Sequence, residues 1–127
     1  MNSESWHKIL TLLTVVIVAD KRVYQEEVNK FVQVVTNLNA VISPDIFMTK
    51  KMAFDWFVAN REDIKNSLHL PDGDIRLKKL INSFQSGPYQ TLILRAMMDI
   101  AQADNDFHDS EKTIIDMASE VWNVQLA

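Results

Sequence analysis

Apolar residues recur along most of the chain at steps of three and four, the spacing of one face of an α-helix. The stretch from Ile9 to Ala19 is apolar on nearly every side, so it predicts a central, heavily buried helix that starts at a Ser3 cap and runs to about Asp20. From Gln25 to Ile42, a single apolar stripe predicts a second helix. The remaining pattern predicts two short helices within residues 45–70, separated by a break at Asn60, and three more over residues 75–84, 89–103 and 109–122.

Turn residues are few and fall between the predicted helices. Ser43 and Pro44 end the second helix, and Pro44 suits the first turn of the next one with Ser43 as its cap. Only two Gly and three Pro occur in 127 residues, fewer than the many turns of an all-β protein would need. A hydrophobic content of 47% is enough for one sizeable core. We therefore expect an all-α fold, a compact bundle of about six to seven helices in a single domain over residues 1–127.

One short acidic pattern occurs twice, as ADKRVYQEE and as ADNDFHDSE. Each copy ends one apolar stretch and opens the next, which predicts a helix-turn-helix corner. Glu27 follows Asp20 by seven positions in the first copy, and Glu111 follows Asp104 by seven positions in the second. The pattern therefore indicates two related acidic corners in one fold.

The corner carboxylates have a structural interpretation. Glu27 and Glu111 fall in the first turn of a predicted helix, where unpaired backbone N–H groups favour a negative charge. Asp20 and Asp104 lie at the ends of the preceding helices, where their side chains can accept hydrogen bonds from N–H groups of the following turn. In this interpretation all four residues are helix caps.

The alternative is a weak site for a hard divalent cation, Ca²⁺ or Mg²⁺, both of which prefer oxygen ligands. At the second corner its ligands would be Asp104, Asp106 and Glu111, and at the first corner Asp20 and Glu27. The second corner is not an EF-hand loop, because it has no central Gly and its Glu comes too soon after the first Asp. The sequence leaves the cap and the cation interpretations open.

The net charge of −4 is unevenly distributed. Residues 99–120 contain seven Asp and Glu against one Lys, so this end of the chain predicts an acidic surface. A basic partner protein could dock there, with Asp109 and Asp116 as candidate contact residues. The middle of the chain is mildly basic, but its interleaved acids and the lack of a base-stacking motif argue against nucleic-acid binding.

The paired corners, followed by Val28-x-x-Phe31 and Lys112-x-x-Ile115, resemble those of the TerB-like family over nearly the whole chain. That family includes a tellurite-resistance protein and the N-terminal domain of a membrane-anchored co-chaperone. The resemblance implies an all-helical domain whose two corners pack as pseudo-symmetric halves, and a stress-linked, non-enzymatic role. It also implies acidic corners that bind metal, through Asp20, Glu27, Asp104 and Glu111. Where the family usually has a Ser or Thr cap, this chain has Tyr24 and His108.

Signatures of other functions are missing from the sequence. It has no cysteine, no phosphate-binding Gly-rich loop, no Gly-x-Ser-x-Gly and no His-Glu-x-x-His, so we expect no enzymatic activity. The apolar run of residues 9–19 is shorter than the about 20 residues that cross a bilayer, and we interpret it as a core helix of a cytoplasmic protein without direct membrane insertion. The expected function is a stress-associated module that binds a divalent cation at its corners. The alternative is an interaction scaffold that uses the acidic face, with the corners only structural.

Overall fold

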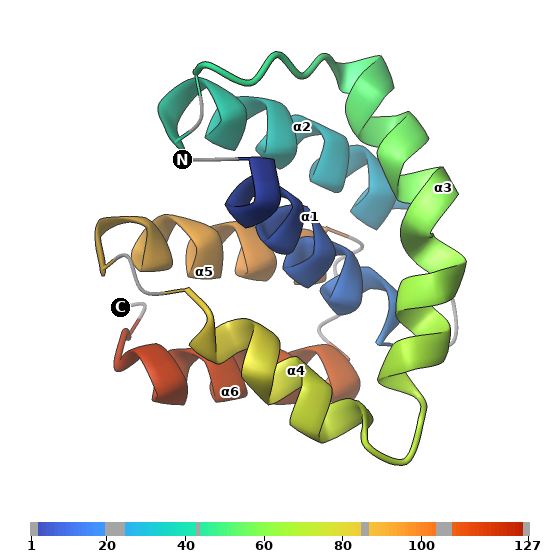
Figure 1. The fold of residues 1–127 in the computed structure, drawn as a ribbon, viewed down its shortest axis with the longest axis vertical. Helices are drawn as coiled ribbons and strands as arrows, with labels where there is room; N and C mark the ends of the chain where they lie inside the picture. The colour runs from blue at the N-terminus through green and yellow to red at the C-terminus, as the bar shows by residue number, and fades with distance from the viewer. Residues whose placement is uncertain (1–2, 20–24, 43, 85–86, 104–107, 126–127) are drawn as a thin grey trace.

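The computed structural model describes residues 3–19, 25–42, 44–84, 87–103 and 108–125, which form six α-helices and no strand (Figure 1). The prediction of an all-helical bundle is confirmed. The helices are α1 (Ser3–Val18), α2 (Gln25–Ile42), α3 (Lys50–Leu68), α4 (Gly73–Asn82), α5 (Gly87–Ala101) and α6 (Asp109–Trp122). In the part of the chain that is described, no helix is both long and apolar enough to cross a membrane.

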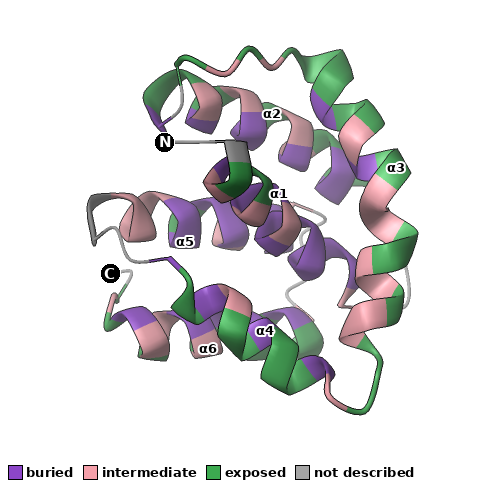
Figure 2. Cartoon of the chain, viewed as in Figure 1, coloured by how far each residue is buried: buried purple, intermediate pink, exposed green. Residues whose placement is uncertain are grey.

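Helix α1 is the centre of the bundle and contacts all five other helices (Figure 1). From Ile9 to Val18, every side chain except that of Thr11 is buried (Figure 2). Thr14 is the one buried polar residue of this stretch, and its hydroxyl donates a hydrogen bond to the Leu10 carbonyl at 2.8 Å. A helix that is apolar on all sides is stable only when other elements surround it, so the sequence pattern itself requires this arrangement.

Helix α2 packs its apolar stripe against α3 and α5. The predicted range of residues 25–42 is confirmed. Phe31 is fully buried, and its ring lies 5.4 Å from that of Phe57 on α3 in a tilted arrangement. Aromatic contacts of this kind add to the stability gained from burying the two rings.

Helix α3 differs from the prediction in two ways. It is one continuous helix, because the Asn60 side chain donates to the Trp56 carbonyl within the helix at 2.8 Å instead of capping a new one. It also begins only at Lys50, where the Thr49 hydroxyl caps it by accepting a hydrogen bond from the Met52 N–H at 3.1 Å. Ser43, the predicted cap, lies outside the described residues, and residues 44–49 are not helical.

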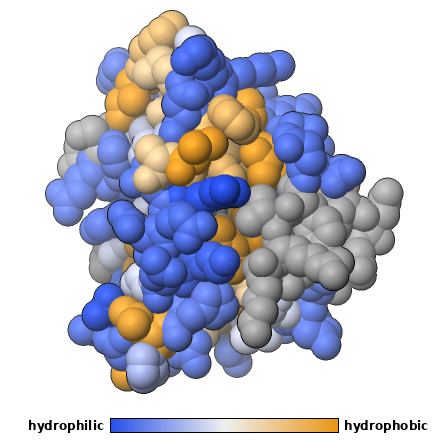
Figure 3. All heavy atoms as spheres, turned by 90° about the vertical axis from the view of Figure 1, so that its right-hand side faces the viewer, coloured by the Kyte–Doolittle hydropathy of each residue, from blue (hydrophilic) through white to orange (hydrophobic). Residues whose placement is uncertain are grey.

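The outer side of α3 faces solvent. Only Ala53 and Phe57 of its 19 residues are buried. Figure 3 shows this side of the molecule, where apolar patches alternate with hydrophilic side chains. Phe54 and Val58 are among the exposed apolar residues. Helix α3 therefore covers α1 and α2 with a narrow strip of its surface.

The start of α4 is fixed by a close approach to the end of α3. A Cβ atom at Gly73 would lie 1.9 Å from the Leu68 carbonyl oxygen, so only glycine fits there. At its other end, α4 is joined to α6 because the Trp122 indole N–H donates to the Ile81 carbonyl at 2.9 Å. The Trp122 ring also meets the ring of Phe84 edge to face at 5.8 Å. These contacts connect α4 to the helices on both sides of it.

Candidate functional site

The first acidic corner joins α1 to α2. Of its two candidate ligands, Asp20 lies outside the described residues, whereas Glu27 is the third residue of α2 and is fully buried. Its position in the first turn matches the prediction, and a carboxylate there faces the positive end of the helix dipole.

The second acidic corner joins α5 to α6. Asp104 and Asp106 lie outside the described residues, and Glu111 is the third residue of α6. The Glu111 Oε1 atom accepts a hydrogen bond from the backbone N–H of His108 at 3.2 Å. His108 is the N-cap residue and has an extended backbone. Glu111 therefore makes the carboxylate half of a capping box, as its place in the first turn predicts.

The two glutamates share an environment as well as a helical position. Both have an exposed fraction of 0%, and within the described ranges they are the only ionisable side chains that are buried. Transfer of a carboxylate from water to a protein interior costs several kcal/mol unless hydrogen bonds or opposite charge compensate. The burial of Glu27 and Glu111 at equivalent helix positions therefore requires specific stabilising partners at each corner.

The described residues do not assemble a complete cation site. They contain no group of three or more His, Cys, Asp or Glu residues placed to hold a metal ion. Two of the five proposed ligands, Glu27 and Glu111, are described, and they belong to different corners. Among the described residues, each corner thus contributes one buried carboxylate, and the cation site stays a prediction.

The acidic surface lies on α6. Asp109, Asp116 and Glu120 are exposed, and their spacings of seven and four residues place them on one face of the helix together with Lys112. Glu120 belongs to the predicted acidic end of the chain but not to the predicted contact residues, although its helical spacing from Asp116 signals the shared face. The predicted contact residues Asp109 and Asp116 are therefore accessible to a partner.

Shallow grooves run along both sides of this acidic face. One, of about 400 Å³, lies between α6 and α4 and includes Met117 and Val121. The other, of about 290 Å³, lies between α6 and α5 and includes Met98. Asp116 lines both grooves. The face thus combines negative charge with apolar side chains at its edges.

Comparison with known proteins identifies the family. No curated protein and no solved structure gives a significant match to the chain. The sequence model of one family, described as tellurite resistance protein TerB, matches residues 7–126. This match includes all six helices except the first residues of α1, and it includes both acidic corners. The chain therefore belongs to the TerB family.

Proposed function

We propose that this TerB-family domain is a non-enzymatic, stress-associated cytoplasmic module that binds Ca²⁺ or Mg²⁺ weakly at its acidic corners. The observation that carries the proposal is the full burial of Glu27 and Glu111 at the same position of two helices. Family membership supports the association with stress. At the second corner, Asp104 and Asp106 would supply further oxygen ligands to the cation.

Helix capping and cation binding are compatible at Glu111. A carboxylate has about four acceptor positions on its two oxygens. The hydrogen bond from His108 uses one position on Oε1. Glu111 can therefore hold the start of α6 and contribute an oxygen to a cation at the same time.

Calorimetric titration of Ca²⁺, and then Mg²⁺, into chelator-treated protein tests the proposal. Saturable heat is expected for the parent and is expected to vanish in Asp104→Asn. Glu111→Gln is informative because its amide oxygen can still accept the hydrogen bond from the His108 backbone N–H. The negative charge that favours a cation is lost. This variant should keep its melting temperature in chelator and lose the heat.

A control variant separates ligand loss from a general loss of negative charge. Asp99 is an exposed acid near the end of α5, and Asp99→Asn should bind as the parent does. A bound cation must also increase the free energy of unfolding, by about 2.7 kcal/mol at a hundredfold excess over its dissociation constant, and so raise the melting temperature. No heat and no thermal shift at millimolar cation would leave the glutamates as helix caps only.

A second function is favoured by the exposed acidic face of α6. In this second function the domain would act as a scaffold, and a basic partner protein would dock on Asp109, Asp116 and Glu120. Co-precipitation from a lysate of the host should lose its basic partner when Asp109→Lys and Asp116→Lys are introduced. Glu62→Lys, an equal charge reversal on exposed α3, should leave capture intact. Equal capture by all three variants would exclude α6 as the docking surface.

A further inference from the structure

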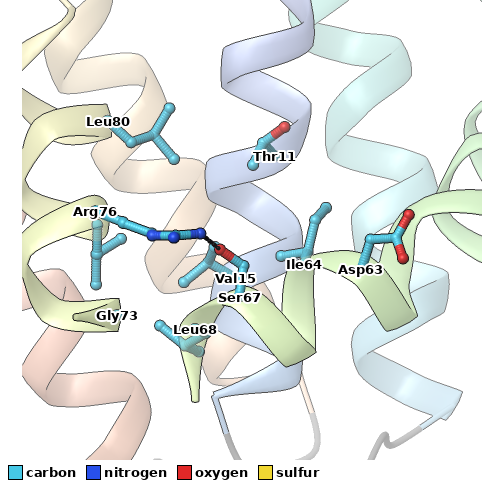
Figure 4. A pocket seen from close by; sticks show the side chains of 10 residues that line it. Thr11, Val15, Asp63, Ile64, Ser67, Leu68, Gly73, Arg76 and Leu80 are labelled. Carbon is cyan, nitrogen blue, oxygen red and sulfur yellow. Dashed lines mark hydrogen bonds between the residues drawn. The ribbon is translucent and has the colours of Figure 1, made fainter. Parts of the chain in front are cut away.

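A separate pocket of about 210 Å³ lies between α1, α3 and α4 (Figure 4). None of its lining residues belongs to either acidic corner. Most of its surface is apolar and is contributed by Val15 of α1, Ile64 and Leu68 of α3, and Leu77 and Leu80 of α4. Concave, mainly apolar sites with a few polar groups at one edge are typical of small-molecule binding.

The polar edge of the pocket is formed by Arg76 and Ser67. Figure 4 shows the Arg76 side chain extending from α4 toward Ser67 on α3. Its Nη1 donates to the Ser67 Oγ over a long 3.4 Å, and its Nε donates to the Asp72 carboxylate at 2.9 Å. Asp63, the other charged lining residue, lies at the opposite end of the pocket and turns its carboxylate away from Arg76 (Figure 4).

This geometry favours an anionic head group. The 3.4 Å contact between the guanidinium and a neutral hydroxyl is weak, whereas a carboxylate would form shorter, charge-assisted bonds with the same donor. The Ser67 hydroxyl can also donate to such a group. We propose that the pocket between α1, α3 and α4 binds a small amphipathic carboxylate, with its apolar body between the helices and its head group on Arg76 and Ser67.

The size of the pocket limits the size of the ligand. A cavity of about 150 Å³ accepts benzene, so a pocket of 210 Å³ has room for about eight non-hydrogen atoms. Hexanoate has that size and is the probe of choice. A ligand this small is expected to bind with a millimolar dissociation constant. The proposal involves neither acidic corner and does not depend on cation binding.

Methyl NMR of the folded domain tests the proposal without any substitution. Titration with hexanoate should shift the methyl signals of Val15, Ile64, Leu68, Leu77 and Leu80 in a saturable way. Hexan-1-ol should shift the same signals with an affinity about fivefold lower, because it lacks the charge that Arg76 recognises. Acetate, which lacks the apolar body, should not saturate them. Absence of saturation by hexanoate, or shifts that centre on other methyl groups, would overturn the proposal.

A pair of matched variants tests the role of Arg76. Arg76→Met keeps an apolar stem and removes the charge, so hexanoate should bind about fivefold more weakly while hexan-1-ol binds as before. Lys79→Met removes one positive charge from the exposed surface of the same helix and should change neither affinity. Equal loss of hexanoate affinity in the two variants would show that overall charge, and not Arg76, accounts for binding.

Discussion

The close approach of Gly73 to the end of α3 predicts a large effect of one added methyl group. In Gly73→Ala the new Cβ would start 1.9 Å from the Leu68 oxygen and 2.7 Å from the Leu68 carbonyl carbon, whereas contacts below 3.0 Å are essentially never observed. Both atoms belong to the backbone of α3, so no side-chain rotation relieves the clash. The ends of α3 and α4 must separate by about 1 Å, an overpacking that typically costs roughly 1–3 kcal/mol, and a clash between backbone atoms belongs at the upper end of this range.

The expected net loss of stability is about 2 kcal/mol, because the better helix propensity of Ala offsets part of the strain. For a domain of this size, that loss corresponds to a melting temperature lower by roughly 8 °C. Thermal and urea unfolding followed by circular dichroism measure both quantities. Ile75→Ala, which truncates a 62% exposed side chain on the same helix, should stay within about 0.5 kcal/mol of the parent. A Gly73→Ala protein as stable as its parent would refute the close approach of α3 and α4.

Three further predictions address packing and charge. Trp122→Phe removes the hydrogen bond to the Ile81 carbonyl and should lower the free energy of unfolding by about 1–2 kcal/mol in urea melts; an unchanged value would contradict a role for that bond. Phe57→Ala empties a fully buried site and should cost about 3–5 kcal/mol by the same assay, so a loss below 1 kcal/mol would contradict its burial. Asp55 raises the pKa of Lys51 above the usual 10.5, so the stabilisation from this pair is present below pH 10.5 and lost as the pH rises through the folded-state pKa. NMR titration of Asp55→Asn should return the pKa of Lys51 to its usual range, and an unchanged pKa would exclude the pair as the cause.

The sequence predicts a helix correctly where the capping residues and the apolar spacing indicate the same bounds. The bounds of α2 and α6 match the expected ranges because an acidic first turn and a regular apolar stripe coincide in each. The prediction failed within residues 45–70, where the local signal of Asn60 suggested a helix start. The amide of Asn60 is satisfied by the Trp56 carbonyl inside α3, and the packing of that helix on α1 and α2 outweighs the local preference.

The candidate sites were predictable to different degrees. The seven-residue spacing that repeats at Glu27 and Glu111 marked both as corner residues, but no local pattern indicates that a charged side chain will be buried completely. The contact between Arg76 and Ser67 had no sequence signal, because it joins two helices whose crossing depends on tertiary packing. The repeated acidic pattern therefore identified the corners, and no pattern in the sequence identified the pocket.

The position of α1 at the centre of the bundle has a consequence for synthesis in the cell. Among the described helices it is synthesised before the others, whereas α5 and α6, which cover part of its apolar surface, are synthesised after them. Until they emerge, a helix with almost no polar side remains exposed to other nascent chains, and such surfaces aggregate readily. Fragments that end before α5 should therefore expose this apolar surface and aggregate. The core around α1 is complete only once α5 and α6 are packed against it.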